Sequence, residues 1–294
     1  MFLMDTLSRT LMFAFLIASM LSVGMQATMK DLRSLLASKG LLFRALLANF
    51  VVVPIIGIVL VRVLPLKPEA ATALLILACT PGGISALQFT TKIKGEKFFA
   101  GSSAFLMSVL AVFLSPVLLT LALRGNISVV VPYGRALFFV VAFLLLPLVA
   151  GMLVSGRAER LAGKLSKLFG LASVVLFVAV LLLIRGERKE AMNAVGKEAL
   201  LYMLLFIVLS MVAGWLMAGR AKEARPVLAT VTSMRNVALC LLLALKTFPD
   251  PAVQTPLVAF SALMVPPNML LTLYWAIRNR KKPVGKEAEI PGSK

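Results

Sequence analysis

Hydrophobic residues run in long uninterrupted stretches, separated by short polar or cationic connections. The stretches at 11–27, 41–64, 98–123, 136–154, 165–184, 199–217, 227–245 and 252–277 each suit a membrane-spanning helix, which takes about 20 apolar residues. Two others, 70–80 and 84–93, are too short to span alone and flank Pro81-Gly82-Gly83, so we expect two halves of one broken span. The pattern predicts an all-α polytopic membrane protein with about nine spans, because transmembrane strands would alternate instead.

Composition supports a membrane protein and excludes several other classes. Apolar residues make up 60% of the 294 residues and charged residues 15%, whereas soluble domains average about 45–50% and about 25%. The chain has no histidine and only two cysteines, both inside apolar stretches, so we expect no metal centre, no cofactor and no disulfide framework. It also lacks a G-x-S-x-G sequence, a Walker A sequence and paired carboxylates within one span, so we expect no enzyme activity.

The net charge of +19 would suggest a nucleic-acid partner in a soluble protein. Here most lysines and arginines lie in alternate connections, near 30–39, 92–97, 157–167, 220–225 and 278–294. The positive-inside rule then predicts an outside N-terminus and an inside C-terminus, with a lipid bilayer and no nucleic acid as partner. We expect one transmembrane unit over 1–281 and a polar cytoplasmic tail over 282–294, in a cell membrane of the prokaryotic inner-membrane type.

Arg235 is the most informative residue, because it lies in the middle of a predicted span. It is ten residues from Arg225 and eleven from Lys246, the cations at the two ends of that span. A central arginine costs at least about 2.5–3.5 kcal/mol to insert, and every acidic residue of the chain falls in a loop or at a span end. Helix carbonyls, amides or an anionic ligand could be its partners, so a structural and a ligand-binding role both remain open.

The break at Pro81-Gly82-Gly83 is the second signal. A helix broken inside the membrane leaves carbonyls and amides without partners, which is tolerated where they are buried in protein or line a cavity. The amides that begin the second half-helix would suit an anion, with Ser85 and Gln88 on its first turns. A matching interruption at 232–236 pairs with this break, and such pairs are typical of inverted-repeat transporters with a site at the bilayer midplane.

Three polar residues complete the candidate site. Asn236 and Ser233 flank Arg235 in the second interruption, and we expect both to bind substrate. Asn49 lies inside the span 41–64, where a buried amide is either a bond between helices or a ligand contact. For Asn49 the two interpretations carry equal weight.

At 78–87 the chain resembles the bile acid:sodium symporter family, whose signature is a Pro-Gly-Gly break ahead of the second half of a crossing helix. Similarity extends over about 11–277, at 49–54, 115–116, 146–151, 233–236 and 274–275. The resemblance implies two inverted repeats, a panel domain and a core domain that move against each other, and two discontinuous helices that cross where substrate and two sodium ions bind. It also implies that the first helix of the ten-helix members has no counterpart here.

The departures from the family concern the sodium ligands. The resemblance places other residues where the family has oxygen-bearing ligands, and Arg235 stands where a glutamine would be. The remaining replacements are Ala86, Leu87, Ala100, Ala104, Val231 and Asn49. Hard cations need several oxygen ligands, so we expect the sodium sites to be lost and the guanidinium of Arg235 to replace a bound cation.

The sequence therefore predicts a secondary transporter that moves a small or amphipathic organic anion by alternating access without sodium. Facilitated diffusion or anion exchange is favoured over proton coupling, because the spans hold no carboxylate or histidine. Three alternatives remain: a sodium-coupled symporter that uses backbone carbonyls and Asn49, a membrane receptor that does not transport, and a carrier of the related auxin-efflux type.

Overall fold

The computed structural model describes residues 6–26, 39–81, 97–123, 134, 138, 141–183, 195–222, 224–247 and 253–280, and every regular element within them is helical. Two short π-helices, η1 and η2, continue directly into the α-helices that follow them. The elements are α1 (Thr6–Gln26), α3 (Lys39–Leu47), η1 (Ala48–Val52), α4 (Val53–Val63), α5 (Pro68–Cys79), α7 (Lys97–Leu123), η2 (Val141–Leu145), α9 (Leu146–Arg157), α10 (Glu159–Leu183), α12 (Lys197–Met217), α13 (Ala224–Ser233), α14 (Val237–Thr247), α15 (Gln254–Leu263) and α16 (Val265–Arg280).

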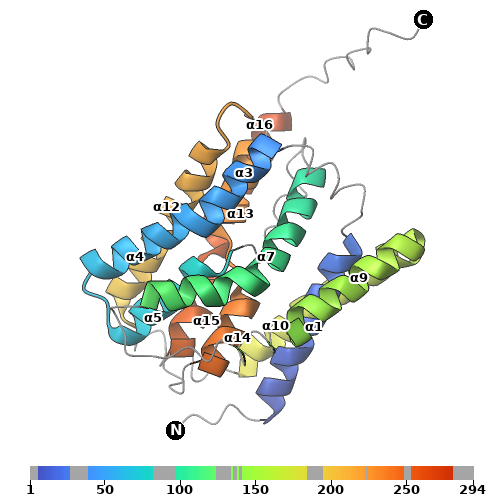
Figure 1. The fold of residues 1–294 in the computed structure, drawn as a ribbon, viewed down its shortest axis with the longest axis horizontal. Coiled ribbons are helices and arrows are strands. Elements are labelled where there is room, and N and C mark those ends of the chain that lie inside the picture. Colours follow the sequence, from blue (N-terminus) through green and yellow to red (C-terminus); the bar gives the residue numbers. More distant parts are fainter. Residues whose placement is uncertain are drawn as a thin grey trace, which may run out of the picture.

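The described helices fall on the predicted stretches, and their arrangement is drawn in Figure 1. The stretch expected at 84–93 lies outside the described residues. Three continuous helices are long and apolar enough to cross a membrane: Lys39–Val63, Lys197–Met217 and Gln254–Trp275. Several shorter apolar helices accompany them, among them Pro68–Cys79. The prediction of an all-α membrane protein is confirmed, whereas the number of nine spans and their orientation stay predictions.

The outer surface of α12 shows why this fold needs lipid. On one side of the helix Leu201, Val208 and Leu216 are exposed, and on the other side Phe206 and Ser210 are buried. A helix that is apolar on both its packed and its open side has no polar face to present to water. The exposed apolar side therefore suits acyl chains.

Both π-helices end two residues before a proline in the next helix. Pro54 follows η1 and Pro147 follows η2, each in the first turn of its α-helix. Proline has no N–H to give to the preceding turn, and a local π geometry is one way in which membrane helices satisfy the carbonyl that is released. The widened turn of η1 also carries Asn49, which is buried.

The centre of the molecule is α5, the first half of the predicted broken span. Every residue from Ala70 to Cys79 is buried, and α5 packs against α4, α7, α14 and α15. The carbonyls at the C-terminal end of a helix have no partner within it. Because α5 ends in the protein interior, other side chains must satisfy these carbonyls.

A second group of helices, α1, α9 and α10, packs together beside this core (Figure 1). Helices α1 and α9 cross so closely that a Cβ on Gly24 would overlap the Leu148 carbonyl oxygen. Small residues at such a crossing let two backbones approach and gain dispersion contacts, which drive helix association in lipid. The described helices thus pack in two groups, one around α5 and one made of α1, α9 and α10.

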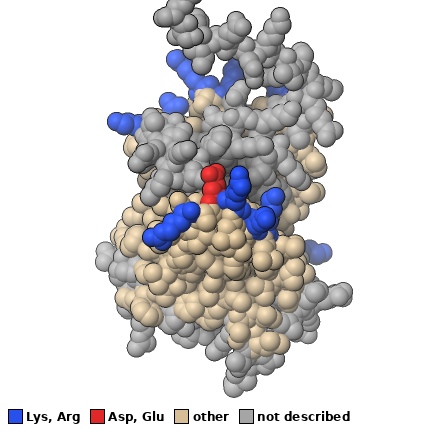
Figure 2. Space-filling view, turned by 90° about the vertical axis from the view of Figure 1, so that its right-hand side faces the viewer, with Lys and Arg blue, Asp and Glu red and all other residues tan. Residues whose placement is uncertain are grey.

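Cations on the surface form a zone separate from the apolar surface. Figure 2 shows lysine and arginine side chains gathered above a broad area without charged side chains, on the face that α9 and α10 present. Exposed Arg157, Arg160 and Lys164 belong to the corner between these two helices. The tail at 282–294 and the connection at 184–194 lie outside the described residues.

Candidate functional site

The first break in the core follows α5. Cys79 ends the helix, Thr80 leaves helical geometry with φ −114° and ψ 80°, and buried Pro81 follows. The Thr80 hydroxyl donates back to the Ile76 carbonyl at 2.8 Å. Helix α5 therefore ends just before Pro81, whereas the second half-helix expected at 84–93 lies outside the described residues, together with Gly82, Gly83, Ser85 and Gln88.

The second break separates α13 from α14. Residues Met234, Arg235 and Asn236 lie between the two helices, as the interruption in the sequence predicted. Asn236 begins α14, because its Oδ1 accepts the Leu239 N–H at 3.1 Å in the manner of a helix N-cap. The Asn236 N–H donates to the Thr80 carbonyl at 3.3 Å, so the two breaks meet.

Arg235 joins the two breaks and is fully buried. Its Nε donates to the Leu77 carbonyl at 2.8 Å, and its Nη2 donates to the Ala78 carbonyl at 2.7 Å. Its Nη1 donates to Asn49 Oδ1 at 3.1 Å and to the Thr232 carbonyl at 3.3 Å. Four oxygens from three segments thus surround one cation.

The chemistry of these oxygens explains how a buried arginine is tolerated. The Leu77 and Ala78 carbonyls belong to the C-terminal end of α5, where the helix dipole favours positive charge. Hydrogen bonds to an ionised donor are about twice as strong as those between neutral groups. The guanidinium offers five N–H donors, and the four bonds leave little capacity for a further direct ligand.

Asn49 is held in place by the other end of its amide. Its Nδ2 donates to the Ala45 carbonyl at 3.0 Å and to Thr232 Oγ1 at 3.3 Å. The amide oxygen therefore faces Arg235 in a fixed orientation. The structure brings together Asn49 and Arg235, two residues that the sequence analysis placed in the candidate site.

Ser233 contacts a different part of the core. Its hydroxyl donates to Asn268 Oδ1 at 2.8 Å, and the Asn268 amide donates to the Met264 carbonyl at 2.8 Å. Asn268 lies in α16 just after Pro266-Pro267, and that kink was the signal in the sequence that could have added it to the candidate site. Ser233 and Arg235 thus share one break but have separate hydrogen-bond partners.

Two buried polar atoms on either side of Arg235 in the chain have no partner among the described residues: Asn236 Nδ2 and Thr230 Oγ1. Asn236 is 3% exposed and Thr230 is not exposed at all. A buried donor without a partner costs about 1–3 kcal/mol. The Asn236 amide is therefore a donor that a bound ligand could use.

Thr80 and Cys240 add a contact that the sequence interpretation left out of the site. Thr80 Oγ1 and Cys240 Sγ are 2.7 Å apart, and this contact ties the end of α5 to α14. Both cysteines of the chain are buried and free. Within the described part of the chain, no group of three or more His, Cys, Asp or Glu side chains could hold a metal ion.

The helical fold, its lipid-facing surface and the meeting of two helix breaks around a buried cation define the class as membrane transport protein, with several helices crossing the bilayer. Residues 13–195 match the Sodium Bile acid symporter family. The chain belongs to this family, as the residues at the first break indicated.

Curated relatives agree with this class. The chain is 26% identical over 276 residues to the probable sodium/metabolite cotransporter BASS2, chloroplastic, of Oryza sativa subsp. japonica, covering 92% of this chain and 64% of that protein. It is 23% identical over 272 residues to the uncharacterized sodium-dependent transporter YocS of Bacillus subtilis (strain 168), covering 92% and 84%. Identity to the probable sodium/metabolite cotransporter BASS1, chloroplastic, of Arabidopsis thaliana is 25% over 246 residues, covering 81% and 60%.

The chain thus spans less than two thirds of the length of the two plant relatives. The family and these relatives are transporters, which confirms the expectation that the chain is not an enzyme. The bacterial relative fits the expected prokaryotic cell membrane.

Proposed function

We propose that this protein is a secondary transporter that moves an organic anion by alternating access, without sodium, and that Arg235 is its built-in cation. One observation carries the proposal: the guanidinium of Arg235 is surrounded by oxygens at the meeting of two helix breaks. In transporters with broken helices, carbonyls of this kind and the C-terminal ends of half-helices coordinate the coupling cation. A covalently attached cation would make a mobile one unnecessary there.

Sodium coupling is the second candidate, and the names of the relatives favour it, since they are described as sodium-dependent or sodium cotransporters. The oxygens that a sodium ion would use argue against it at this position. The Leu77 and Ala78 carbonyls and Asn49 Oδ1 already accept bonds from Arg235. A sodium ion placed among them would also face the guanidinium charge at close range, which is repulsive.

The proposed anion site uses the charge of Arg235 and the donors around it. Asn236 Nδ2 has no protein partner among the described residues and is available to an anionic oxygen. The described acidic residues, Glu69, Glu159 and Glu198, lie in the first turns of their helices, away from this charge. Ser233, Ser85 and Gln88 complete the proposed site, with Arg235 acting through its charge more than through free N–H groups.

Alternating access would use the two helix groups of the fold. Helices α1, α9 and α10 form the candidate panel, and the helices around α5 form the candidate core. The start of α1 and the end of α16 lie at opposite ends of the molecule in Figure 1, which supports an odd number of crossings. Nine spans with the N-terminus outside would satisfy this arrangement. In the same proposal, an inverted repeat relates the two breaks.

The test is the thermal stability of purified protein in matched sodium chloride and choline chloride, for wild type, Arg235→Gln and Arg160→Gln. Arg160 is an exposed arginine and controls for the loss of one charge. We expect the wild type and Arg160→Gln to melt at the same temperature in both salts. We expect Arg235→Gln to melt lower in choline and to recover partly in sodium, because sodium can then occupy the oxygens left unpaired.

Sodium-dependent stabilisation of the wild type would contradict the proposal and favour the coupled symporter. Transport itself is tested by uptake of a panel of labelled carboxylates into proteoliposomes without sodium. A receptor that does not transport would give no uptake above empty vesicles for any of them.

A further inference from the structure

A cluster of arginines surrounds the turn that joins α12 to α13, apart from the site around Arg235. It forms a pocket with a volume of about 620 Å³. Three arginines from two parts of the chain line the pocket beside a tryptophan. The lining residues are Arg44, Trp215, Leu216, Gly219, Arg220 and Arg225.

The turn itself positions two of the arginines. Gly219 has φ +60°, a conformation that glycine adopts without strain, and its N–H donates to the Leu216 carbonyl at 3.0 Å to end α12. Its carbonyl accepts two bonds from Arg225, at 3.1 Å from Nε and 2.8 Å from Nη2. Arg44 Nη1 donates to the neighbouring Ala218 carbonyl at 3.4 Å. A side chain at position 219 would overlap Arg44.

Most of the donors in the pocket remain unused. A guanidinium has five N–H donors, and within the described residues Arg44 uses one, Arg225 uses two and Arg220 uses none. None of the three forms an ion pair with a carboxylate of the described part of the chain. Like charges around one pocket repel each other, so the pocket favours an anion.

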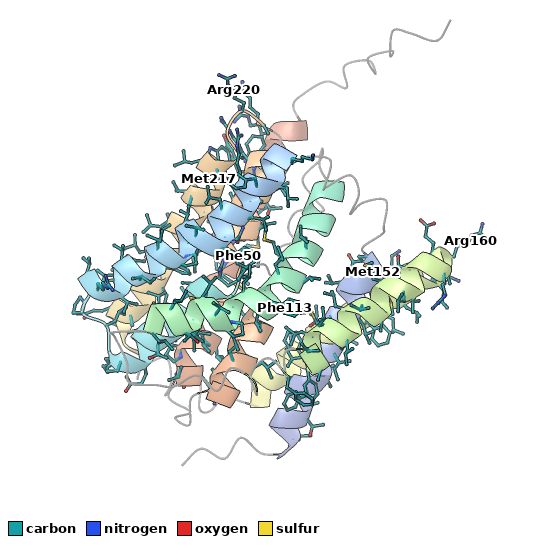
Figure 3. The ribbon with its side chains drawn as sticks, in the orientation of Figure 1. Phe50, Phe113, Met152, Arg160, Met217 and Arg220 are labelled. Carbon is teal, nitrogen blue, oxygen red and sulfur yellow. The ribbon has the colours of Figure 1, made fainter. Side chains whose placement is uncertain are left out.

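The pocket lies at the end of two candidate membrane spans. Arg44 belongs to the first turns of the span Lys39–Val63, and Trp215 belongs to the last turn of the span Lys197–Met217. Figure 3 shows Arg220 and Met217 at the end of the molecule where α3 begins. The positive-inside rule assigns an end this rich in arginine to the cytoplasmic side.

Aromatic and apolar side chains give the pocket the character of a membrane interface. The rings of Trp215 and Trp275 lie 5.7 Å apart, and Arg278 lies 5.1 Å from the Trp275 ring. Tryptophan is enriched at the level of lipid headgroups. Phe43, which precedes Arg44 in the sequence, is 65% exposed, and Leu216, which lines the pocket, is 68% exposed, so apolar surface adjoins the charged pocket.

We propose that this pocket binds the phosphate group of an anionic phospholipid from the cytoplasmic leaflet, with the acyl chains on the adjoining apolar surface. Basic pockets between membrane helices on this side bind such headgroups. Arginine recognises phosphate through two parallel N–H bonds, which three guanidinium groups can supply from different directions. The pocket is separate from the site around Arg235, and the proposal does not depend on what the protein transports.

The experiment measures the melting temperature of the detergent-purified protein as short-chain phosphatidylglycerol, phosphatidylcholine or glycerol phosphate is added. The variant is Arg220→Glu, since Arg220 is exposed and makes no hydrogen bond within the described residues. The matched control is Arg160→Glu, an exposed arginine outside the pocket. Arg44→Gln is a second pocket variant in case the charge reversal impairs folding.

We expect phosphatidylglycerol to raise the melting temperature of the wild type and phosphatidylcholine to leave it unchanged. The apparent affinity should fall at least about tenfold in Arg220→Glu, which corresponds to about 1.4 kcal/mol, and should stay unchanged in Arg160→Glu. Equal effects of the two lipids, or equal weakening by the two variants, would overturn the proposal. Stabilisation by glycerol phosphate as strong as that by phosphatidylglycerol would also overturn it and assign the pocket to a soluble anion.

Discussion

Replacing Asn49 by leucine tests whether Arg235 depends on its side-chain partner. The change keeps the branching at Cγ and removes the oxygen that accepts a bond from Arg235 Nη1 at 3.1 Å. It also removes the donor to Thr232 Oγ1 at 3.3 Å. The backbone carbonyls of Leu77 and Ala78 keep their bonds to Arg235, so the cation stays in place with one acceptor fewer.

The expected loss of stability follows from these bonds. A hydrogen bond to a charged group contributes about 1.5–3 kcal/mol and a neutral one about 0.5–1.5 kcal/mol, so the loss of these two bonds in Asn49→Leu should cost about 2–4.5 kcal/mol. For a domain of this size, each kcal/mol lowers the melting temperature by about 2–4 °C. The melting temperature should therefore fall by at least about 4 °C.

The assay is thermal unfolding in detergent, with Ser210→Ala as the matched control. Ser210 is a buried polar residue of α12 whose hydroxyl has no partner among the described residues. Its removal should leave the melting temperature unchanged or raise it, because an unsatisfied polar group is deleted. An Asn49→Leu protein as stable as the wild type would refute the argument that Asn49 shares the charge of Arg235.

Two further predictions concern packing, and a third concerns the accessibility of the core. Gly24→Leu should disrupt the crossing of α1 and α9, because even a Cβ at that position would overlap the Leu148 carbonyl, and the folded yield on size exclusion should collapse. Gly163→Ala in α10 meets no atom within 4 Å and should raise stability by up to about 1 kcal/mol through helix propensity, as measured by thermal unfolding. Cys79 and Cys240, both fully buried, should react with a maleimide only after denaturation; fast labelling of the folded protein would contradict the described core.

The sequence was sufficient to predict much of the fold, because a membrane helix is specified mainly by its own length and apolarity. The helices of the described residues fall on the predicted stretches, and the interruption between α13 and α14 was visible from an arginine in an apolar run. Pro81 likewise marked the end of α5 in advance. These features depend on short segments, so the order of residues along the chain is enough to find them.

The partners of Arg235 are a matter of tertiary structure. The Leu77 and Ala78 carbonyls carry no signal in their side chains, because any residue at the end of α5 would offer the same oxygens. Asn268 and Thr80 are polar residues beside prolines, and their roles depend on which helix happens to face them. The arginine pocket brings together Arg44 and Arg225, which are far apart in the chain.

The sequence by itself determined that this protein is a multi-pass helical membrane protein with a helix that is interrupted at Arg235 and a second that ends at Pro81. Only the tertiary structure decided what surrounds that cation, since backbone carbonyls become ligands when packing buries a helix end and removes water from it. The same physics explains why a charge that is costly in an isolated helix is stable here: the end of α5 and the amide of Asn49 replace the water that Arg235 loses.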